Sequence, residues 1–401
     1  MYDYIVVGAG YAGAVCARRL AEELDARVLV LDKRGHIAGN MYDFYNADGI
    51  LVHQYGPHIS VMNEKRTFDF LSRFTEWIPY HHSVNVEIDG KQVPLPVNLT
   101  SIELLFHTKE AISLKHKLVT AYGAGSGIPI LELLKSEDAQ LKKLAEYIYE
   151  KVFVHYTMKM WGLSPDEIDP SVTARIPVRL SYDNRHFLHT YQVMPKYGFT
   201  RLFEKMLGHP KITVRLNTNA SEVLRLLENG SVEFQGQAYD GRVIYTGALD
   251  ELFGYRYGAL PYRSLAFEFQ TFAVDYVQES TVLNWPDDRP ATRRTEMKRL
   301  TGQKKHGVTT TVTEYPGRYD PSSDRFCEPY YPIVQERYIA QHGKYLKELG
   351  KYKQIQPVGR LADYKYYNME AVIQRALDVS ESLIGHVRRG LEFNEVFNEG
   401  L

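Results

Sequence analysis

Three glycines near the N-terminus stand at the spacing that binds a dinucleotide. Gly8, Gly10 and Gly13 follow the apolar run of residues 4–7 and precede a stretch of small and apolar residues at helical spacing. Gly8 permits a tight turn, Gly10 lets backbone amides approach a pyrophosphate, and Gly13 allows the helix to pack closely. The positive end of the helix dipole then faces the anion. We therefore expect a strand, a turn and a helix that bind the phosphates of a dinucleotide.

An acidic residue stands where the ribose of such a ligand would need it. A second apolar run, residues 28–31, ends at Asp32, about 20 residues after the glycine turn. This spacing favours hydrogen bonds from ribose hydroxyls to Asp32. The alternative to dinucleotide binding is a glycine-rich turn in an ordinary α/β fold. The basic pair Lys33-Arg34 follows the acid, and a later strand at residues 243–247 returns to the same sheet. These features are typical of flavoproteins, so we favour FAD over NAD.

The composition excludes several classes of partner. Lys and Arg number 48 against 49 Asp and Glu, so the chain has no net field that would attract nucleic acid or a membrane surface. Cys16 and Cys327 are too few for a disulfide framework, and no residues stand at zinc-ligand spacing. No apolar run reaches the roughly 18 residues of a membrane span. We therefore expect a small-molecule ligand, no metal, and a cytoplasmic location.

The first half of the chain is predicted to continue with a helix, a hairpin and a helical insertion. The helix is expected over residues 63–74, and the hairpin, at the edge of a sheet, over residues 83–97. Thr100 and Glu103 form a capping-box pattern, which predicts the start of a helical segment that continues to about residue 160. A further short helix is expected to start at Ser164.

The second half of the chain is predicted to contain two kinds of sheet. Strand patterns over residues 177–197 and 262–314 predict an antiparallel sheet in the middle of the chain. The apolar runs at residues 212–214 and 357–359 suit a parallel nucleotide-binding sheet. A C-terminal helix is expected from Asn368 to about Val387.

Together these elements predict an α/β fold with a discontinuous, Rossmann-like FAD-binding domain. A helical-bundle insertion and an antiparallel β-sheet domain complete it. The expected boundaries are 1–76, 198–250 and 338–401 for the FAD-binding domain, 98–170 for the helical domain, and 77–97, 171–197 and 251–337 for the sheet domain.

Segments along nearly the whole chain resemble the UDP-galactopyranose mutase family. The agreement of this many segments in order is more specific than any one of them. The matching segments are MYDYIVVGAG at the N-terminus, DKRGHIAGN, YGPHI at 55–59, YTMKMWG at 156–162, RIPVR at 175–179, EPYYP at 328–332 and GRLADYKYYNM at 359–369.

The resemblance implies an amine-oxidase-like FAD domain and an enzyme that interconverts the pyranose and furanose forms of a UDP-sugar. In that family the flavin must be reduced: its N5 attacks the anomeric carbon, UDP leaves, and the sugar recloses on another hydroxyl. The resemblance also implies an electron donor such as NAD(P)H, a homodimer, and a part in cell-surface polysaccharide biosynthesis.

The same resemblance implies the site residues. Arg175 and Arg293 match two arginines that contact the diphosphate, and His58 matches a residue that lies against the flavin; these three are the expected catalytic residues. The expected substrate-binding residues are Tyr156, Thr157, Trp161, His186, His82, Asn284, Tyr331, Tyr366 and Val61. The expected cofactor-binding residues are Gly8, Gly10, Ala12, Gly13, Asp32, Lys33, Asn40, His58, Ile59, Val214, Arg360, Tyr367, Asn368 and Met369.

Each of these residues also has a purely structural interpretation. A surface salt bridge is the alternative for either arginine, and core packing is the alternative for the tyrosines. Tyr330 and Tyr367 adjoin two of the matched tyrosines, and strand alternation leaves open which member of each pair is functional. The start of a helix at Asn368 would place its positive end towards the isoalloxazine and stabilise a reduced, anionic ring.

Five positions depart from the usual residues of the family. Val61 replaces a second histidine, His82 an asparagine, Met160 a glutamine, His186 a tyrosine and Asn368 an aspartate. Because an unpaired buried polar group costs about 1 to 3 kcal/mol, such exchanges change which sugar the pocket accepts. We therefore expect a modified sugar, such as an acetamido, deoxy or pentose variant, with UDP as the nucleotide.

Two other classes of function remain open at this stage. An FAD-dependent oxidoreductase of the amine-oxidase type would share the fold but would have no use for two diphosphate-binding arginines. A flavin-binding protein that has lost activity would be compatible with the five exchanged residues.

Overall fold

The computed structural model describes residues 2–162 and 177–390. The side chain of Trp161 lies outside the described part of the chain, and so do Arg175 and the helix predicted to start at Ser164. Within the described ranges, no helix is both long and apolar enough to cross a bilayer. The same ranges hold no group of three or more His, Cys, Asp or Glu side chains arranged to bind a metal ion.

A five-stranded parallel sheet forms the centre of the cofactor-side half. Its strands, in spatial order, are β12 (Ile212–Arg215), β2 (Val28–Leu31), β1 (Tyr4–Val7), β16 (Arg242–Tyr245) and β22 (Ile355–Pro357). Every residue of β2 is buried, as expected for a parallel strand that is covered on both faces. The prediction that these distant apolar runs join one sheet is therefore confirmed.

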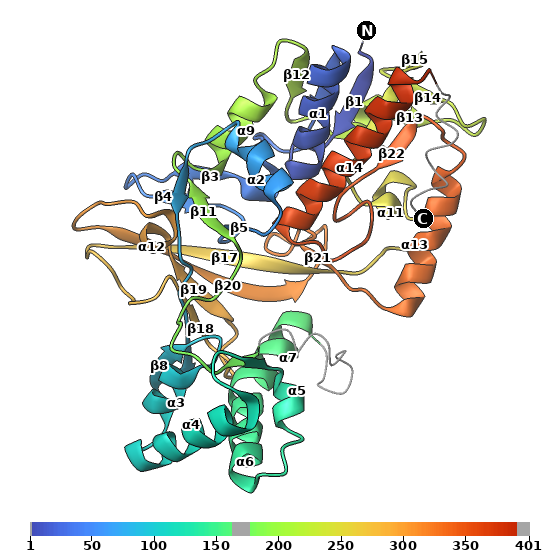
Figure 1. Cartoon of the computed structure of the whole chain (residues 1–401). Helices are drawn as coiled ribbons and strands as arrows, with labels where there is room; N and C mark the ends of the chain where they lie inside the picture. Colours follow the sequence, from blue (N-terminus) through green and yellow to red (C-terminus); the bar gives the residue numbers. More distant parts are fainter. Residues whose placement is uncertain (1, 163–176, 391–401) are drawn as a thin grey trace.

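Two helices that are far apart in the sequence pack together beside this sheet. α1 (Tyr11–Leu24) and α14 (Met369–Arg388) lie side by side in Figure 1, where they are coloured dark blue and red. Asn368 caps α14, because its side-chain Oδ1 accepts a hydrogen bond from the backbone N–H of Ala371 at 2.8 Å. The predicted start of the C-terminal helix is therefore confirmed.

A seven-stranded sheet forms the second layer. Among the described strands of this sheet the β18–β7 pair is parallel and the other pairs are antiparallel, and the predicted hairpin occupies one edge. In spatial order the strands are β21 (Tyr331–Pro332), β17 (Tyr262–Phe272), β20 (Thr309–Arg318), β19 (Arg293–Glu296), β18 (Val282–Asn284), β7 (Val84–Ile88) and β8 (Lys91–Pro94).

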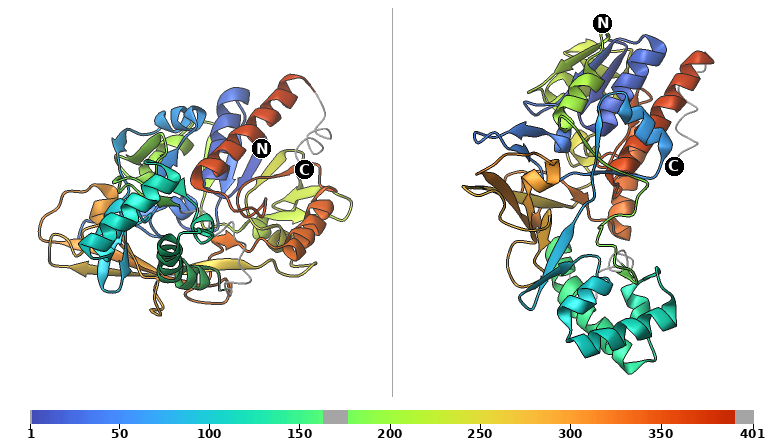
Figure 2. Two further views of the ribbon diagram at one scale, coloured as in Figure 1. Left: turned by 60° about the horizontal axis from the view of Figure 1, so that its bottom comes forward. Right: turned by 60° about the vertical axis from the view of Figure 1, so that its left-hand side comes forward.

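The helical insertion forms a lobe with its own apolar core at one end of the molecule, as the right-hand view of Figure 2 shows. Its first helix does not begin at the predicted capping box of Thr100 and Glu103. Asn98 caps it instead, in a reciprocal box with Ser101, because Asn98 ends the extended backbone. The helices are α3 (Leu99–Leu105), α4 (Thr108–Tyr122), α5 (Ile130–Leu133), α6 (Ala139–Ile148), the π-helix η2 (Tyr149–Val154) and α7 (His155–Trp161).

The strands of residues 177–197 do not join the seven-stranded sheet, contrary to the prediction. β10 (Val178–Arg179) pairs with β9 (Gly127–Ile128), and β11 (Tyr191–Pro195) pairs with β5 (Ser60–Met62) and β6 (Trp77–Pro79). An alternating pattern indicates a strand but carries no information on its partner, so the error lies in the pairing.

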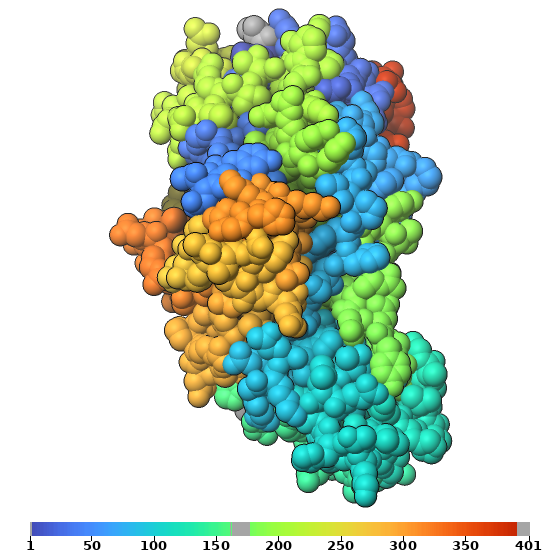
Figure 3. Space-filling model, turned by 90° about the vertical axis from the view of Figure 1, so that its left-hand side faces the viewer, coloured from blue at the N-terminus to red at the C-terminus, as the bar shows by residue number. Residues whose placement is uncertain are grey.

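The remaining elements complete the two halves. Figure 3 shows the β3–β4 hairpin, in blue, directly above the gold and orange part of the large sheet, and α12 contacts β4 there. These elements are η1 (Gly39–Met41), β3 (Asp43–Tyr45), β4 (Leu51–His53), α2 (Lys65–Ser72), α9 (Phe199–Leu207), α10 (Ala220–Val223), β13 (Leu224–Leu226), β14 (Val232–Phe234), β15 (Gln237–Ala238), α11 (Leu249–Leu252), α12 (Met297–Thr301) and α13 (Glu336–Leu349).

Candidate active site

Two adjoining cavities contain most of the residues that the sequence singled out. The dinucleotide cavity, of about 670 Å³, lies at the carboxyl ends of the parallel strands and is lined by the glycine turn. The second cavity, of about 510 Å³, lies between α7, the large sheet and residues 57–61. His58 and Met369 line both cavities. A ligand in one cavity would therefore meet a ligand in the other at these two residues.

The glycine turn has the geometry that the fingerprint predicts. Gly8 has a φ of +102°, and a Cβ on it would lie 2.1 Å from Oγ1 of Thr246. A Cβ on Gly13 would lie 1.9 Å from the carbonyl oxygen of Gly8, so Gly13 allows α1 to pack against the turn. Gly8, Gly10 and Ala12 line the dinucleotide cavity, whereas Gly13 does not.

Asp32 lines the same cavity at the end of β2 and also holds the turn. Its Oδ2 accepts a hydrogen bond from the backbone N–H of Ala9 at 2.8 Å, and its Oδ1 accepts one from Arg34 N–H at 2.9 Å. A carboxylate has about four acceptor positions, so capacity remains for ribose hydroxyls.

The other expected cofactor residues divide into three groups. Lys33, Asn40, Arg360 and Met369 line the dinucleotide cavity. Ile59 and Asn368 line the second cavity instead. Val214 and Tyr367 line neither; Val214 lies in the edge strand β12, and the carbonyl of Tyr367 accepts hydrogen bonds from Arg360 at 2.7 and 3.1 Å.

Sequence reasoning did not assign a role to Arg34, although it stands beside the acid. Its Nη2 lies 2.5 Å from Oε2 of Glu328, and it donates to Oδ1 of Asn40 at 3.0 Å. Arg34 and Glu328 both line the dinucleotide cavity. The signal in the sequence that could have indicated this role is the position of Arg34 in the basic pair that follows Asp32.

His58 is the polar side chain that stands between the cavities. Its Nδ1 is buried and has no hydrogen-bond partner among the described residues. Burial, together with smaller effects of the neighbouring His53 and Arg360, lowers the pKa of His58 to about 3, so the imidazole is neutral near pH 7. An unpartnered ring nitrogen beside a roomy, glycine-lined cavity fits a bound dinucleotide, because the ligand would supply the missing partner.

Arg293 lies in the second cavity with its charge held by a buried carboxylate. Its Nε donates to Oε1 of Glu314 at 2.7 Å, and the two residues face each other across the β19–β20 ladder. Although burial lowers the pKa of Arg293, the charge of Glu314 offsets this effect, and the net shift is upward. The guanidinium therefore stays charged, and its Nη groups remain for a ligand.

Tyr331 and Tyr366 line the second cavity, with their rings 5.4 Å apart. Tyr330, the neighbour of the first, is 3% exposed and packs against Phe267 in the core. Burial raises the pKa of Tyr331 to about 12, so its hydroxyl keeps its proton and can donate. Tyr331 and Tyr366 thus line the cavity, whereas their sequence neighbours Tyr330 and Tyr367 do not.

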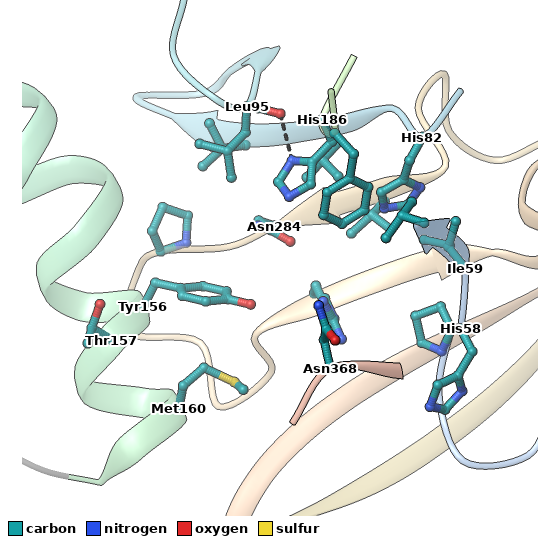
Figure 4. Close-up of a pocket in the computed structure, with 18 of the residues that line it drawn as sticks. His58, Ile59, His82, Leu95, Tyr156, Thr157, Met160, His186, Asn284 and Asn368 are labelled. Atoms are coloured by element: carbon teal, nitrogen blue, oxygen red, sulfur yellow. Dashed lines mark hydrogen bonds between the residues drawn. The ribbon is translucent and has the colours of Figure 1, made fainter. Parts of the chain in front are cut away.

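Tyr156, Thr157 and Met160 line one side of the second cavity from α7, opposite His58 in Figure 4. Arg263, which sequence reasoning missed, also lines this cavity. Its guanidinium donates to the carbonyl oxygens of Met160 at 2.7 Å and Lys159 at 2.9 Å, which ties the end of α7 to β17. A lone arginine in a strand carried no signal of this contact.

His186 presents a hydrogen-bond acceptor to the second cavity. Its Nδ1 lies 2.9 Å from the carbonyl oxygen of Leu95, and because a carbonyl only accepts, Nδ1 carries the proton. Figure 4 shows the other ring nitrogen turned away from Leu95 towards Asn284. Burial lowers the pKa of His186 to about 4, so the ring is neutral and this nitrogen is a bare acceptor.

His82, Asn284 and Val61 complete the polar and apolar lining near His186. His82 Nδ1 lies 2.9 Å from the hydroxyl of Tyr80, and burial lowers the pKa of His82 well below its usual value. Asn284 Oδ1 has no partner in the described part of the chain. Phe187, another residue missed from sequence, stacks on His82. All five positions that depart from the family pattern line this cavity.

The fold and the glycine turn define a Rossmann-type protein with a dinucleotide-binding cavity beside a second cavity. A sequence model of the family "UDP-galactopyranose mutase" matches residues 151–366, and one described as "NAD(P)-binding Rossmann-like domain" matches residues 6–74. The chain belongs to the UDP-galactopyranose mutase family, and it is an isomerase.

Relatives support this assignment, and solved structures share the fold. The chain is 36% identical over 387 residues to a UDP-galactopyranose mutase of Mycoplasma pneumoniae, covering 96% of each chain. It is 33% identical over 388 residues to a dTDP-fucopyranose mutase of Escherichia coli, covering 96% of this chain and 99% of that one. Reduced UDP-galactopyranose mutase shares the fold with a TM-score of 0.66 at 15% identity, covering 100% of this chain and 98% of the other. Putrescine oxidase shares it with a TM-score of 0.59 at 11% identity, covering 96% and 99%.

Proposed function

We propose that the protein is an FAD-dependent mutase that interconverts the pyranose and furanose forms of a nucleotide sugar. The observation that carries this proposal is that His58 and Met369 line both cavities. A cofactor on the glycine turn and a sugar nucleotide near Arg293 would therefore meet at one place. We also propose NAD(P)H as the source of electrons, a homodimeric assembly and a cytoplasmic location.

The chain's residues on the cofactor side bind and tune FAD. Reduced FAD, when bound, supplies N5 as the nucleophile for the anomeric carbon, with no net redox change. The glycine turn and the start of α1 bind the pyrophosphate, and Asp32 accepts from the ribose. The start of α14, capped by Asn368, directs its positive end to the place where the two cavities meet. It would favour a negatively charged flavin ring there.

Arg293 is the residue that we assign to the leaving group. When the bond between the anomeric carbon and the phosphate oxygen breaks, the electron pair remains on the diphosphate. The charged guanidinium, fixed by Glu314, stabilises that negative charge, and Tyr331 and Tyr366 donate hydrogen bonds to it. We propose the second such cation at Arg175.

The sugar side of the second cavity favours a substrate other than plain UDP-galactose. His186 offers an acceptor where the family has a phenol, and Val61 offers a methyl surface where the family has a donor. The relatives differ in nucleotide and sugar at nearly equal identity, 36% for a UDP-galactopyranose mutase and 33% for a dTDP-fucopyranose mutase. We propose an acetamido, deoxy or pentose sugar, with UDP bound by Tyr156, Thr157 and Trp161.

The test is turnover of a panel of nucleotide sugars by the holoenzyme, before and after reduction with dithionite. We expect ring-form exchange only after reduction, no consumption of reductant, and a modified sugar preferred over UDP-galactose. Equal turnover of UDP-galactose with lower turnover of every analogue would contradict the proposal on the sugar.

An FAD-dependent amine oxidase is the second candidate, because putrescine oxidase shares the fold. That reaction requires the substrate to reduce the flavin. Bleaching of the flavin by a substrate in stoichiometric amount, without added reductant, would favour the oxidase and contradict the mutase.

A further inference from the structure

A buried pair of residues lies behind His58 and outside both cavities. Asp43 in β3 and His53 in β4 are direct cross-strand partners, with exposed fractions of 4% and 1%. The nearest approach joins Nε2 of His53 to Oδ2 of Asp43 at 4.0 Å. Neither residue touches the space that a substrate or cofactor would fill, yet both are polar and fully enclosed.

The ring of His53 is connected to His58 through the backbone. The N–H of His58 donates to Nδ1 of His53 at 3.2 Å. An Nδ1 that accepts cannot carry the proton of a neutral imidazole, so the proton is on Nε2, on the side of Asp43. Burial lowers the pKa of His53, although Asp43 opposes the shift, and the neutral form that accepts this hydrogen bond is therefore the stable one.

The side chain of Asp43 is itself held in place by two backbone hydrogen bonds. Its two carboxylate oxygens accept from the backbone N–H groups of Phe199, at 2.6 Å, and Thr200, at 2.7 Å. These groups open α9, and a carboxylate is favourable at a helix N-terminus. The acceptor oxygens of Asp43 face His53 and favour the tautomer whose N–H points towards them.

The turn between His53 and His58 leaves His58 little freedom once that hydrogen bond forms. Gly56 has a φ of +89°, and a Cβ on it would lie 2.8 Å from the ring of Phe267. The turn is therefore packed against the large sheet, and the hydrogen bond from His58 to His53 joins its last residue to β4. The unpartnered Nδ1 of His58 is held at the junction of the two cavities as a result.

We propose that His53 is a positioning residue, which fixes His58 against the cofactor by accepting its backbone N–H, with Asp43 setting the tautomer of His53. This inference rests on the proposed function, because it takes the cofactor to lie against His58. A displacement of about 1 Å at a reacting centre can cost roughly 100-fold in rate, so a backbone hydrogen bond at this position affects turnover.

Two amide variants separate the two contacts of His53. In His53→Asn the side-chain oxygen occupies the place of Nδ1 and can still accept from His58. In His53→Gln the amide nitrogen reaches the place of Nε2 and keeps the contact with Asp43, but the acceptor for His58 is lost. His386, a buried histidine outside both cavities whose Nδ1 contacts the carbonyl of Ser382, provides the control variant His386→Gln.

Four quantities are measured on each holoenzyme: FAD content, the midpoint potential of the flavin, hydrogen exchange of the His58 amide, and kcat and KM. We expect His53→Gln to retain FAD and KM, to shift the potential, to exchange the His58 amide at least about tenfold faster, and to lose about 10- to 100-fold in kcat. His53→Asn and His386→Gln should match the wild type in potential and kcat.

Equal potentials and equal His58 exchange in His53→Gln and the wild type would overturn the inference, and so would an Asn variant as impaired as the Gln variant. If no nucleotide sugar turns over at all, the proposed function fails. The potential and the exchange rate still decide whether His53 positions His58, because neither depends on mutase activity.

Discussion

Arg293 Nε lies 2.7 Å from Glu314 Oε1, directly across the β19–β20 ladder, and Glu314 is only 1% exposed. The buried Glu314 keeps the guanidinium of Arg293, which lines the second cavity, in its charged form. The variant Arg293→Ala should lower kcat by about 100- to 1000-fold, because the leaving diphosphate loses its cation. FAD should remain bound. Rates of ring-form exchange and flavin absorbance measure the two effects.

The matched control is Arg294→Ala, one residue along the same strand. Arg294 does not line the second cavity; its Nε donates to Gln278 and its guanidinium lies over Trp285. Turnover should be nearly unchanged. Wild-type turnover in Arg293→Ala, or equal losses in both variants, would contradict the assigned role.

Glu314→Gln should destabilise the fold as well as weaken catalysis. Removing the buried carboxylate leaves the charge of Arg293 without its partner, which costs about 3 kcal/mol in comparable cases. Urea unfolding measures the loss of unfolding free energy. A variant as stable as the wild type would show that solvent or another group compensates Arg293.

The stability of the protein should fall as the pH drops from about 6.5 to about 4. His186 has a pKa of about 4 when folded, because burial disfavours its charged form, against 6.5 for an exposed histidine. In this window the unfolded chain binds a proton that the folded chain does not, so stability is lost as the pH falls, by about 3 kcal/mol for this residue. His186→Asn keeps a donor for Leu95 but does not titrate. Urea unfolding should therefore show a weaker pH dependence in this variant, and parallel curves would exclude His186 as the cause.

His186→Tyr should change which sugar is preferred. A phenol can donate, whereas the neutral ring of His186 only accepts towards the cavity, so the ratio of kcat/KM for UDP-galactose to that for the preferred sugar should rise by about tenfold. His81→Tyr, at an exposed neighbour of His82, is the control and should leave the ratio unchanged. An unaltered ratio in His186→Tyr would remove this residue from the specificity determinants.

Gly8→Ala should abolish FAD binding. A Cβ there would lie 2.1 Å from Oγ1 of Thr246, at a φ of +102° that disfavours any side chain. Gly123→Ala controls for backbone strain alone, since Gly123 has a φ of +85° with nothing within 4 Å of the added Cβ. We expect the control to lose about 1 kcal/mol of stability and to retain FAD, as measured by its absorbance after gel filtration. Full FAD content in Gly8→Ala would contradict the assignment of the turn.

The parallel sheet and the glycine turn could be predicted because both are encoded locally. β2 and β16 are short apolar runs of the kind that only a strand covered on both faces tolerates, and the glycines occupy positions where a Cβ would clash. The cap at Asn98 was missed because the pattern at Thr100 and Glu103 was equally good locally. The chain's extended path up to Asn98 decided between them.

The residues that line the second cavity could be predicted only where a segment or a single position was matched to the family. Tyr331 and Tyr366 lie in such segments and Arg293 was matched as a single position, whereas Arg263 and Phe187 were not matched and reach the cavity through long-range packing. The role of His53 likewise depends on β3 pairing with β4, and nothing in the sequence near His58 shows that pairing.

The most direct test of the mutase chemistry is the mass of the cofactor. The reduced holoenzyme is incubated with each nucleotide sugar, treated with cyanoborohydride, and denatured, and the released FAD is weighed by mass spectrometry. The proposed function predicts that at least one donor adds the mass of its sugar, without the nucleotide, to the cofactor. Unmodified FAD with every donor, from protein shown to be fully reduced and folded, would contradict it.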